Sequence, residues 1–213
     1  MRDERKAVVE AGYDTIAEPY LEWISRIHDD PRGRMLDELV ARLEPGARVL
    51  DLGCGSGVPS TRTLATRFRV TGVDLSTAQL AIARREVPGV TFIHGDLTEI
   101  DFPAASFDGV TAFYTVSHVP REEHAGLFRR VARWLVPGGL FLATLGATDA
   151  PDWIGDWLGG PMFFSSHDAE TNRRLLAAAG FESLIDEIVE TPEPGGPVPF
   201  LWVLARRVPE ALP

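Results

Sequence analysis

The sequence is poor in cysteine and in long apolar runs, and each shortage excludes a class of protein. Cys54 is the one cysteine among 213 residues, so we expect neither an internal disulfide nor a zinc site built from cysteines, and no metal site. A membrane-spanning helix needs about 20 consecutive apolar residues, and no such run occurs. The N-terminal segment has charges without an apolar run behind them, unlike a secretory signal. We expect a cytoplasmic protein.

Positive charge is also scarce. The chain has 21 lysine and arginine residues against 31 aspartate and glutamate residues, a formal net charge of −10. Proteins that bind nucleic acids usually carry a basic patch that displaces counterions from phosphates. Here arginines gather only as pairs within amphipathic helical patterns, where charge usually faces solvent. We therefore expect neither a nucleic-acid nor a membrane partner.

The remaining composition is that of a folded protein, because apolar residues make up 45% of the chain and can bury a substantial core. A length of 213 residues suits one domain. Neither an internal repeat nor a low-complexity linker divides the sequence. We expect residues 1–213 to form a single domain.

Apolar runs alternate with helical patterns along most of the chain. The runs predict strands at 48–52, 69–73, 90–94, 107–113 and 140–145. The helical patterns fall at 34–43, 60–67, 76–85, 121–135 and 168–179. Within the third of these, Ser76 and Gln79 have the spacing of a capping box. Such alternation is typical of parallel strands joined by right-handed helical crossovers, with helices on both faces of the sheet.

The end of the chain breaks this alternation. Two apolar-rich runs, 182–190 and 199–206, are joined by a segment rich in proline and glycine, with no helix between them. Strands connected in this way run antiparallel. The prediction is therefore an α/β fold with an open, mostly parallel sheet whose last strand is reversed.

The strongest motif is VLDLGCGSG at 49–57, an apolar strand that leads into three alternate glycines before a helix. Glycine lets a ligand approach the backbone closely, and ligands bind beyond this strand in open parallel sheets. Nicotinamide enzymes use G-x-G-x-x-G here, but Val58 takes the place of the last glycine. The loop alone also fits a flavodoxin-like protein or a reductase. Asp51 favours a cofactor with a cationic amino group, which a carboxylate can hold.

Acidic residues also end the next two predicted strands. Asp74 lies about 20 residues past the glycines, where a carboxylate can accept both hydroxyls of a ribose. Asp96 follows Gly95 at the end of the third run and can accept the exocyclic amine of an adenine. Both acids should lie at the carboxyl edge of the sheet.

Together these segments resemble the class I S-adenosylmethionine (SAM)-dependent methyltransferases of the small-molecule type, which have a Rossmann-like fold. The resemblance covers nearly the whole chain, because VLDLGCGSG, VTGVDLS, GDLTEIDFP and WLVPGGLFLATLG follow the family's order and spacing. It implies the strand order 3-2-1-4-5-7-6, with the last strand antiparallel. It also implies SAM as the cofactor, S-adenosylhomocysteine as the product, and an N-terminal lid helix within residues 1–30.

The resemblance further implies a set of cofactor-binding residues. The loop glycines would line the methionine and ribose portion, two leucines would sandwich the adenine, and Phe113 would lie near the transferable methyl group. Cys54 lies within the loop, where a packing or backbone role is expected because no base stands beside it. The full set is Asp51, Gly53, Cys54, Gly55, Gly57, Asp74, Leu75, Asp96, Leu97 and Phe113.

His118 follows the fourth strand at the edge where reaction centres lie, and it is a candidate catalytic base. A histidine suits proton removal near neutral pH. The alternative is a hydrogen-bonded loop residue. Tyr13 and Tyr20, in the lid segment, are further catalytic candidates. Direct methyl displacement needs a base only when the acceptor keeps its proton until the transition state.

The segment 146–166 is predicted to be a glycine-rich, loop-like insertion that forms part of the acceptor site. Its aromatic residues suit a flat, partly apolar acceptor. The alternative is a small satellite core under the loop. The candidate acceptor contacts, including one residue just past the segment, are Trp153, Trp157, Met162, Phe163, Phe164 and His167.

The expected activity is transfer of the SAM methyl group to an O, N, S or C nucleophile of a small molecule, which includes secondary metabolites. Two other functions stay open. A protein of the same fold can bind SAM without transferring the methyl group, as a cyclase or a binding module. The second is a nicotinamide oxidoreductase. Val58, in place of the last glycine of G-x-G-x-x-G, disfavours this function.

Overall fold

A seven-stranded sheet forms the centre of the structure, a computed structural model in which residues 3–27, 30–193 and 195–208 are described. The strand order is β3-β2-β1-β4-β5-β9-β8. Five strands run parallel, namely β1 (Arg48–Leu52), β2 (Arg69–Asp74), β3 (Thr91–His94), β4 (Phe107–Ala112) and β5 (Leu135–Gly146). The sheet is completed by β9 (Val198–Arg207), antiparallel to β5, and by β8 (Phe181–Thr191), antiparallel to β9.

This topology confirms the predicted fold, including the reversed last strand. A separate hairpin, formed by β6 (Ala150–Trp157) and β7 (Gly160–Ser166), stands outside the main sheet. Without it, β8 and β9 are the sixth and seventh strands of the order 3-2-1-4-5-7-6. The last strand is reversed because a short connection joins β8 to β9 and contains no helical crossover.

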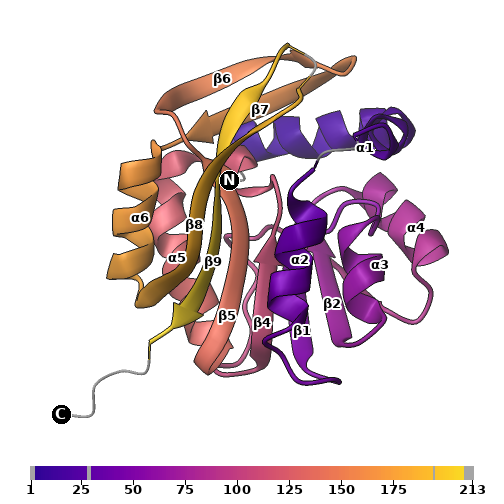
Figure 1. Cartoon of the computed structure of the whole chain (residues 1–213). Coiled ribbons are helices and arrows are strands. Elements are labelled where there is room, and N and C mark those ends of the chain that lie inside the picture. Colours follow the sequence, from indigo (N-terminus) through magenta and orange to yellow (C-terminus); the bar gives the residue numbers. More distant parts are fainter. Residues whose placement is uncertain (1–2, 28–29, 194, 209–213) are drawn as a thin grey trace.

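Helices cover both faces of the sheet (Figure 1). One face carries α2 (Arg32–Val40) and α3 (Ser60–Ala65), and the other carries α5 (His124–Trp134) and α6 (Ala169–Ala178). A further helix, α4 (Thr77–Glu86), packs beside β2 and β3. Two hydrophobic cores therefore lie on opposite sides of the strands.

The alternation of side chains along β1 connects these two cores. Val49 packs with Leu39 of α2 and Leu64 of α3, whereas Leu50 packs with Phe128 of α5. Successive strand residues point to opposite faces, so a strand covered on both sides reads as a continuous apolar run. All four of these leucine and valine side chains are fully buried.

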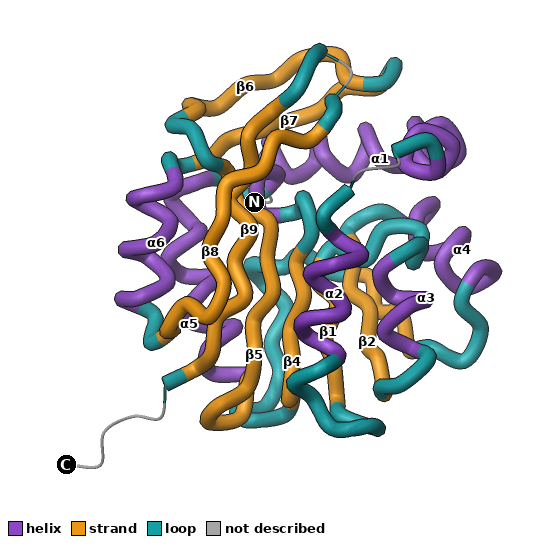
Figure 2. Tube along the Cα trace, viewed as in Figure 1, coloured by secondary structure: helices purple, strands orange, loops and turns teal. Residues whose placement is uncertain are grey.

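The longest helix, α1 (Glu4–Ser25), lies at the carboxyl end of the parallel strands, next to the β6–β7 hairpin (Figure 2). It accounts for most of the described part of the predicted lid segment. Residues 1, 2, 28 and 29 lie outside the described residues. Within the described part of the chain, no helix is long and apolar enough to cross a membrane.

The prediction that 146–166 is loop-like was wrong, since most of it forms the β6–β7 hairpin. Trp153 pairs with Phe164 across the two strands, and Gly155 pairs with Met162. Glycine and proline weaken the local strand signal. Packing of β7 on α1, a segment far away in the sequence, supplies the stability that the local pattern does not reveal.

Gly12 sets the distance between α1 and β7. A Cβ atom at this position would lie 2.1 Å from the carbonyl oxygen of Pro161. Val9 and Ile16 of α1 pack with Met162 and Phe163 of β7 in a small buried cluster around this contact. Because the obstructing atom belongs to the backbone, an added methyl group cannot be accommodated by a side-chain rotation.

We therefore predict that Gly12→Ala lowers the melting temperature by about 3–10 °C, since overpacking costs roughly 1–3 kcal/mol in a domain of this size. Gly126, inside α5, has open space around it and provides the matched control. Gly126→Ala should stabilise the protein by about 0.5–1 kcal/mol through helix propensity. Equal melting curves for the two variants would show that α1 does not depend on close contact at Gly12.

Candidate active site

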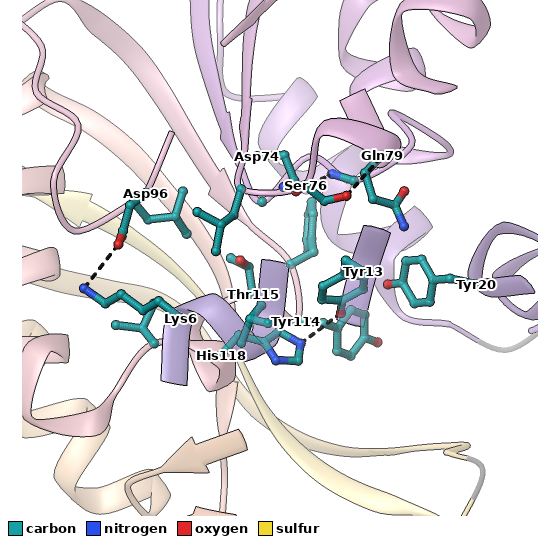
Figure 3. Close-up of a pocket in the computed structure, with 17 residues that line it drawn as sticks. Lys6, Tyr13, Tyr20, Asp74, Ser76, Gln79, Asp96, Tyr114, Thr115 and His118 are labelled. Carbon is teal, nitrogen blue, oxygen red and sulfur yellow. Dashed lines mark hydrogen bonds and ion pairs between the residues drawn. The ribbon is translucent and has the colours of Figure 1, made fainter. Parts of the chain in front are cut away.

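A cavity of about 690 Å³, including the open space at its mouth, lies between α1 and the carboxyl ends of β1 to β4. Figure 3 shows Lys6 and Asp96 at one end and Tyr13 and Tyr20 at the other. Ten of the residues singled out from the sequence line it, namely Tyr13, Tyr20, Gly53, Gly55, Asp74, Leu75, Asp96, Leu97, Phe113 and His118.

The three loop glycines all have positive φ, but only two line the cavity. The φ angles are 64° at Gly53, 53° at Gly55 and 75° at Gly57, values that favour glycine. A Cβ at Gly55 would meet no atom closer than 3.8 Å, so the backbone there is open to a ligand. A Cβ at Gly57 would lie 3.0 Å from Val87. Gly57 thus lets α4 pack closely against the loop and is not part of the lining.

Asp51 and Cys54 also lie beside the cavity rather than in its lining. The Asp51 carboxylate accepts hydrogen bonds from the hydroxyls of Thr61, at 2.6 Å, and Thr111, at 2.7 Å. Burial raises the pKa of Asp51. This group ties β1 to α3 and β4 from within the protein. The Cys54 side chain is buried against Gly72, where a Cβ would lie 2.9 Å from the sulfur.

Asp74 fixes the glycine loop to the end of β2. One carboxylate oxygen accepts the N–H of Gly55 at 2.8 Å, and the other accepts the N–H of Ser76 at 2.9 Å. Each oxygen retains a further acceptor site. Burial raises the pKa of Asp74 to about 6. A buried carboxylate with spare acceptor capacity suits a ligand that offers hydroxyl groups.

One buried oxygen of Asp96 accepts no hydrogen bond from the residues that the structure describes. Its Oδ1 accepts both the N–H and the hydroxyl of Thr98, at 2.8 and 2.9 Å. Its Oδ2 accepts no hydrogen bond and lies 3.3 Å from the Nζ of Lys6. Lys6, the one lysine in the sequence, also forms an ion pair with Glu123 at 2.8 Å. Oδ2 is therefore ion-paired with Lys6 but accepts no hydrogen bond from the described residues, so it suits a ligand N–H at this end of the cavity.

Gln79 lines the cavity, and sequence reasoning did not assign it there. Its backbone N–H donates to the Ser76 hydroxyl at 3.1 Å, which is one half of the predicted capping box. The other half is absent, because the Ser76 N–H donates to Asp74 instead. Both polar atoms of the Gln79 side-chain amide are buried and form no hydrogen bond within the described part of the chain. The signal that could have identified it is a polar residue within the buried face of a helix.

A second pocket of about 410 Å³, including the open space at its mouth, adjoins the cavity, and the two share Tyr13, Tyr20, Tyr114 and His118. Trp157 and Phe164 of the hairpin, two of the candidate acceptor contacts, line it. We refer to it as the acceptor pocket.

The other acceptor candidates lie elsewhere. Met162 and Phe163 are fully buried in the cluster with α1, so the satellite-core alternative describes them. Trp153 is 47% exposed and lines an outer groove. His167 is tied to the backbone carbonyl of Arg121 at 3.1 Å and lines neither the cavity nor the acceptor pocket.

His118 stands at the boundary between the cavity and the acceptor pocket, and its ring is held at both nitrogens. Nδ1 lies 2.8 Å from the carbonyl oxygen of Phe163, which can only accept, so Nδ1 carries the proton. Nε2 lies 2.9 Å from the Tyr13 hydroxyl and accepts its hydrogen. Burial lowers the pKa of His118 to about 4. The ring is therefore neutral at pH 7, and its basic lone pair is already engaged by Tyr13.

These features define a class. A parallel sheet with a reversed seventh strand carries a glycine loop after β1 and a cavity lined by carboxylates from the ends of β2 and β3. This is the arrangement of the class I SAM-dependent methyltransferases.

Comparison with known proteins agrees with this assignment. Residues 49–139 match the family described as "Methyltransferase domain". A trans-aconitate 2-methyltransferase from Acidovorax ebreus (strain TPSY) is 40% identical over 117 residues, which cover 53% of this chain and 44% of that protein. The chain spans only about half, or less, of the curated relatives that it matches.

Two solved structures extend the similarity over most of the chain. The amino pentose methyltransferase CalS10 from Micromonospora echinaspora, with SAM bound, is 26% identical with a TM-score of 0.62, covering 84% of this chain and 91% of that one. The 1,6-didemethyltoxoflavin-N1-methyltransferase from Burkholderia thailandensis shares the fold, with 23% identity, a TM-score of 0.72 and coverage of 97% and 90%. The chain belongs to the class I SAM-dependent methyltransferases.

The raised pKa of Asp74 predicts a pH dependence of SAM binding. The ionised form accepts hydroxyl hydrogens, and below about pH 6 the carboxyl becomes protonated. SAM affinity should thus fall roughly tenfold between pH 7 and pH 5, measured by calorimetry. Asp74→Asn should bind more weakly at pH 7 and lose this pH dependence.

As pH falls, the contribution of Asp74 to the free energy of unfolding should rise while SAM affinity falls. This difference in sign separates the effect on binding from acid unfolding. A carboxyl group whose pKa is raised on folding stabilises the protein fully below its unfolded value, and that contribution is lost as pH rises through about 6. The unliganded wild type should therefore gain stability relative to Asp74→Asn as pH falls from 7 to 5. If the stability of the wild type relative to Asp74→Asn fell together with SAM affinity between pH 7 and pH 5, the raised pKa of Asp74 would not explain the loss of binding.

Because the side-chain amide of Gln79 forms no hydrogen bond within the described residues, removing it should raise the stability of the unliganded protein and lower its affinity for SAM. Gln79→Leu removes two buried polar atoms without partners, so the unliganded protein should become more stable. SAM affinity should fall roughly three- to tenfold for the loss of one or two hydrogen bonds. Thr144→Val is the control, because its hydroxyl is also buried without a partner but lies outside the cavity lining. It should leave SAM affinity unchanged, and an unchanged affinity in Gln79→Leu would exclude the amide as a ligand.

Proposed function

We propose that this protein transfers the methyl group of SAM to a nucleophilic atom of a small molecule. The observation that carries the proposal is the junction between the cavity and the acceptor pocket at Tyr13, Tyr20, Tyr114 and His118. A methyltransferase must bring two ligands together at one point while keeping their remaining atoms apart. Two adjoining cavities with one common boundary meet this requirement.

The residues of the cavity fit the chemistry of SAM. Asp74 would accept the ribose hydroxyls. Oδ2 of Asp96, which is ion-paired with Lys6 but accepts no hydrogen bond within the described residues, would accept a hydrogen from the adenine amine. Leu75 and Leu97 would lie against the two faces of the adenine. Gly55 would allow the ligand to approach the backbone. Bound SAM supplies a methyl group on a sulfonium, which is already a strong electrophile.

The main task left to the protein is alignment and the exclusion of water. Correct positioning of two reactants can lower a barrier by roughly 7–11 kcal/mol. We propose that residues 1–30 act as a lid over the cofactor and that 146–166 forms a wall of the acceptor site, so that residues 1–213 work as one unit. Both segments contribute to the acceptor pocket, through Tyr20 and Trp23 of α1 and Trp157 of β6.

We assign His118 a positioning role in place of general base catalysis. Its Nε2 is engaged by the Tyr13 hydroxyl, and burial holds its pKa near 4. The Tyr13 oxygen keeps its acceptor sites, because it donates its hydrogen to His118. Tyr13 would then accept a hydrogen bond from the acceptor molecule at the boundary between the cavity and the acceptor pocket. Tyr20, beside Tyr13 with ring centroids 5.3 Å apart, would limit its movement.

The proposal predicts binding and turnover together. Calorimetry should detect SAM and S-adenosylhomocysteine but not NAD⁺. Labelled SAM should yield S-adenosylhomocysteine and a labelled acceptor when incubated with a panel of small nucleophiles. Rearrangement of an acceptor while SAM remains unconsumed would favour the cyclase alternative. Binding of NAD⁺ in place of SAM would favour an oxidoreductase.

The pH profile of the same reaction distinguishes the two roles of His118. With a pKa near 4, His118 should produce no inflection near pH 6.5. Tyr13→Phe should raise the KM for the acceptor more than it lowers kcat, and His118→Gln should reproduce part of this effect through Tyr13. A rate that rises through pH 6.5 in the wild type and not in His118→Gln would restore the histidine as the base.

A further inference from the structure

The acceptor pocket is walled mainly by aromatic rings. Tyr20, Trp23 and Trp157 form a mutually packed group, with ring centroids 5.6–5.9 Å apart. Tyr114 and Phe200 form a second pair at 5.1 Å, and both groups line the pocket. Figure 3 labels Tyr20 and Tyr114 among the residues that line the cavity, and both also line the acceptor pocket. Aromatic faces carry negative potential and attract cations.

Three charged residues line this pocket, and two of them neutralise each other. The Arg32 guanidinium forms an ion pair with Asp30, with Nε and Nη2 lying 3.1 and 2.5 Å from one carboxylate oxygen. It also lies over the ring of Tyr114, 5.1 Å from its centroid. The positive charge of Arg32 is therefore already compensated by Asp30 within the fold.

Glu193 is the third charged residue. Among the described residues, Arg32 is the one lysine or arginine that lines the acceptor pocket. Burial raises the pKa of the Glu193 carboxyl to about 7, although the nearby Trp157 indole acts to lower it. Asp30 adds to this shift by repulsion. The ionised pocket thus has a net charge of −1, counting Asp30, Arg32 and Glu193, and its uncompensated negative group is Glu193.

We propose that the methyl acceptor is an amine whose nitrogen enters the acceptor pocket and is held by Glu193. This inference rests on the proposed methyl transfer. A carboxylate among aromatic rings attracts a cationic nitrogen both by its charge and through the rings. An acceptor with a carboxylate would meet a net negative pocket in which the one arginine is already paired.

Glu193 also suits the proton and charge balance of an amine reaction. An amine that arrives protonated gives one proton to the Glu193 carboxylate. The freed nitrogen lone pair then forms a bond to the methyl carbon as the carbon–sulfur bond breaks, and the sulfur keeps that electron pair. Positive charge moves from sulfur to nitrogen, so the methylated amine leaves as an ammonium, and Glu193 returns its proton to solvent.

A groove beyond Glu193 can hold the rest of the acceptor. It shares five described residues with the acceptor pocket but none with the cofactor cavity, namely Ser117, Trp157, Phe164, Glu193 and Phe200. The three spaces therefore follow one another in the order cofactor cavity, acceptor pocket and outer groove. The groove is lined further by Trp153 and by a Pro-Gly-rich segment between β8 and β9. We infer that the acceptor amine carries an apolar body, which lies in this groove.

Three probes of equal chain length test the head group: octylamine, octan-1-ol and octanoate. Their affinities are measured by calorimetry with S-adenosylhomocysteine present, so that the ranking does not depend on turnover. Octylamine should bind most tightly and octanoate most weakly. Labelled SAM should give N-methyloctylamine. Butylamine should bind more weakly than octylamine, and Trp153→Ala should reduce that difference.

Glu193→Gln isolates the carboxylate. It should weaken octylamine binding roughly tenfold, while the affinities for octan-1-ol and SAM stay within twofold of wild type. Glu190→Gln, on an exposed part of β8 outside the acceptor pocket and the groove, is the matched control and should change neither. Tighter binding of octanoate or octan-1-ol than of octylamine would overturn the proposal, as would wild-type amine affinity in Glu193→Gln. Failure to bind SAM would instead count against the proposed function itself.

Discussion

The hydrogen bond from the Gly55 backbone to the Asp74 carboxylate is the contact on which the cofactor site depends. It joins the glycine loop, which follows β1, to the end of β2 at 2.8 Å. Burying a carboxylate is costly unless it is hydrogen-bonded, and the raised pKa of Asp74 reflects the part of this cost that remains. The second N–H, from Ser76, begins α4 at the same point. One side chain therefore sets the loop, the strand end and the helix start together.

Helix α1 extends this site into the acceptor pocket. Lys6, Tyr13 and Tyr20 are spaced seven residues apart and so lie along one face of the helix. Lys6 contacts Asp96 at one end of the cavity, Tyr13 contacts His118 at the boundary with the acceptor pocket, and Tyr20 reaches the aromatic wall beyond it. At 1.5 Å per residue, the helix rises about 21 Å between Lys6 and Tyr20. A single helix can therefore influence both ligands, and its close packing on β7 at Gly12 holds it in that position.

The acceptor pocket differs from the cofactor cavity in how its charges are arranged. In the cavity, backbone N–H groups and Lys6 support the carboxylates. In the acceptor pocket, Asp30 and Arg32 compensate each other's charge. Glu193 has no such cation among the described pocket residues and lies near the indole of Trp157. The first arrangement holds charge in place, and the second leaves one group able to gain or lose a proton near neutral pH. In the proposed amine reaction, the two spaces would divide binding and proton transfer between different parts of the chain.

The sequence by itself determined the fold class, because apolar periodicity and the glycine loop are local patterns. The order of the strands was implied by the resemblance to a known family and not by those patterns. Gly55, Asp74 and Asp96 follow directly from those patterns and line the cavity. Tertiary structure decided the rest. It turned 146–166 into a hairpin on α1, and it buried Met162 and Phe163 away from the acceptor pocket. It also brought Arg32, Tyr114 and Glu193 together from distant segments. Burial and charge pairing arise from such long-range contacts, so no local pattern could reveal the lowered pKa of His118 or the uncompensated charge of Glu193.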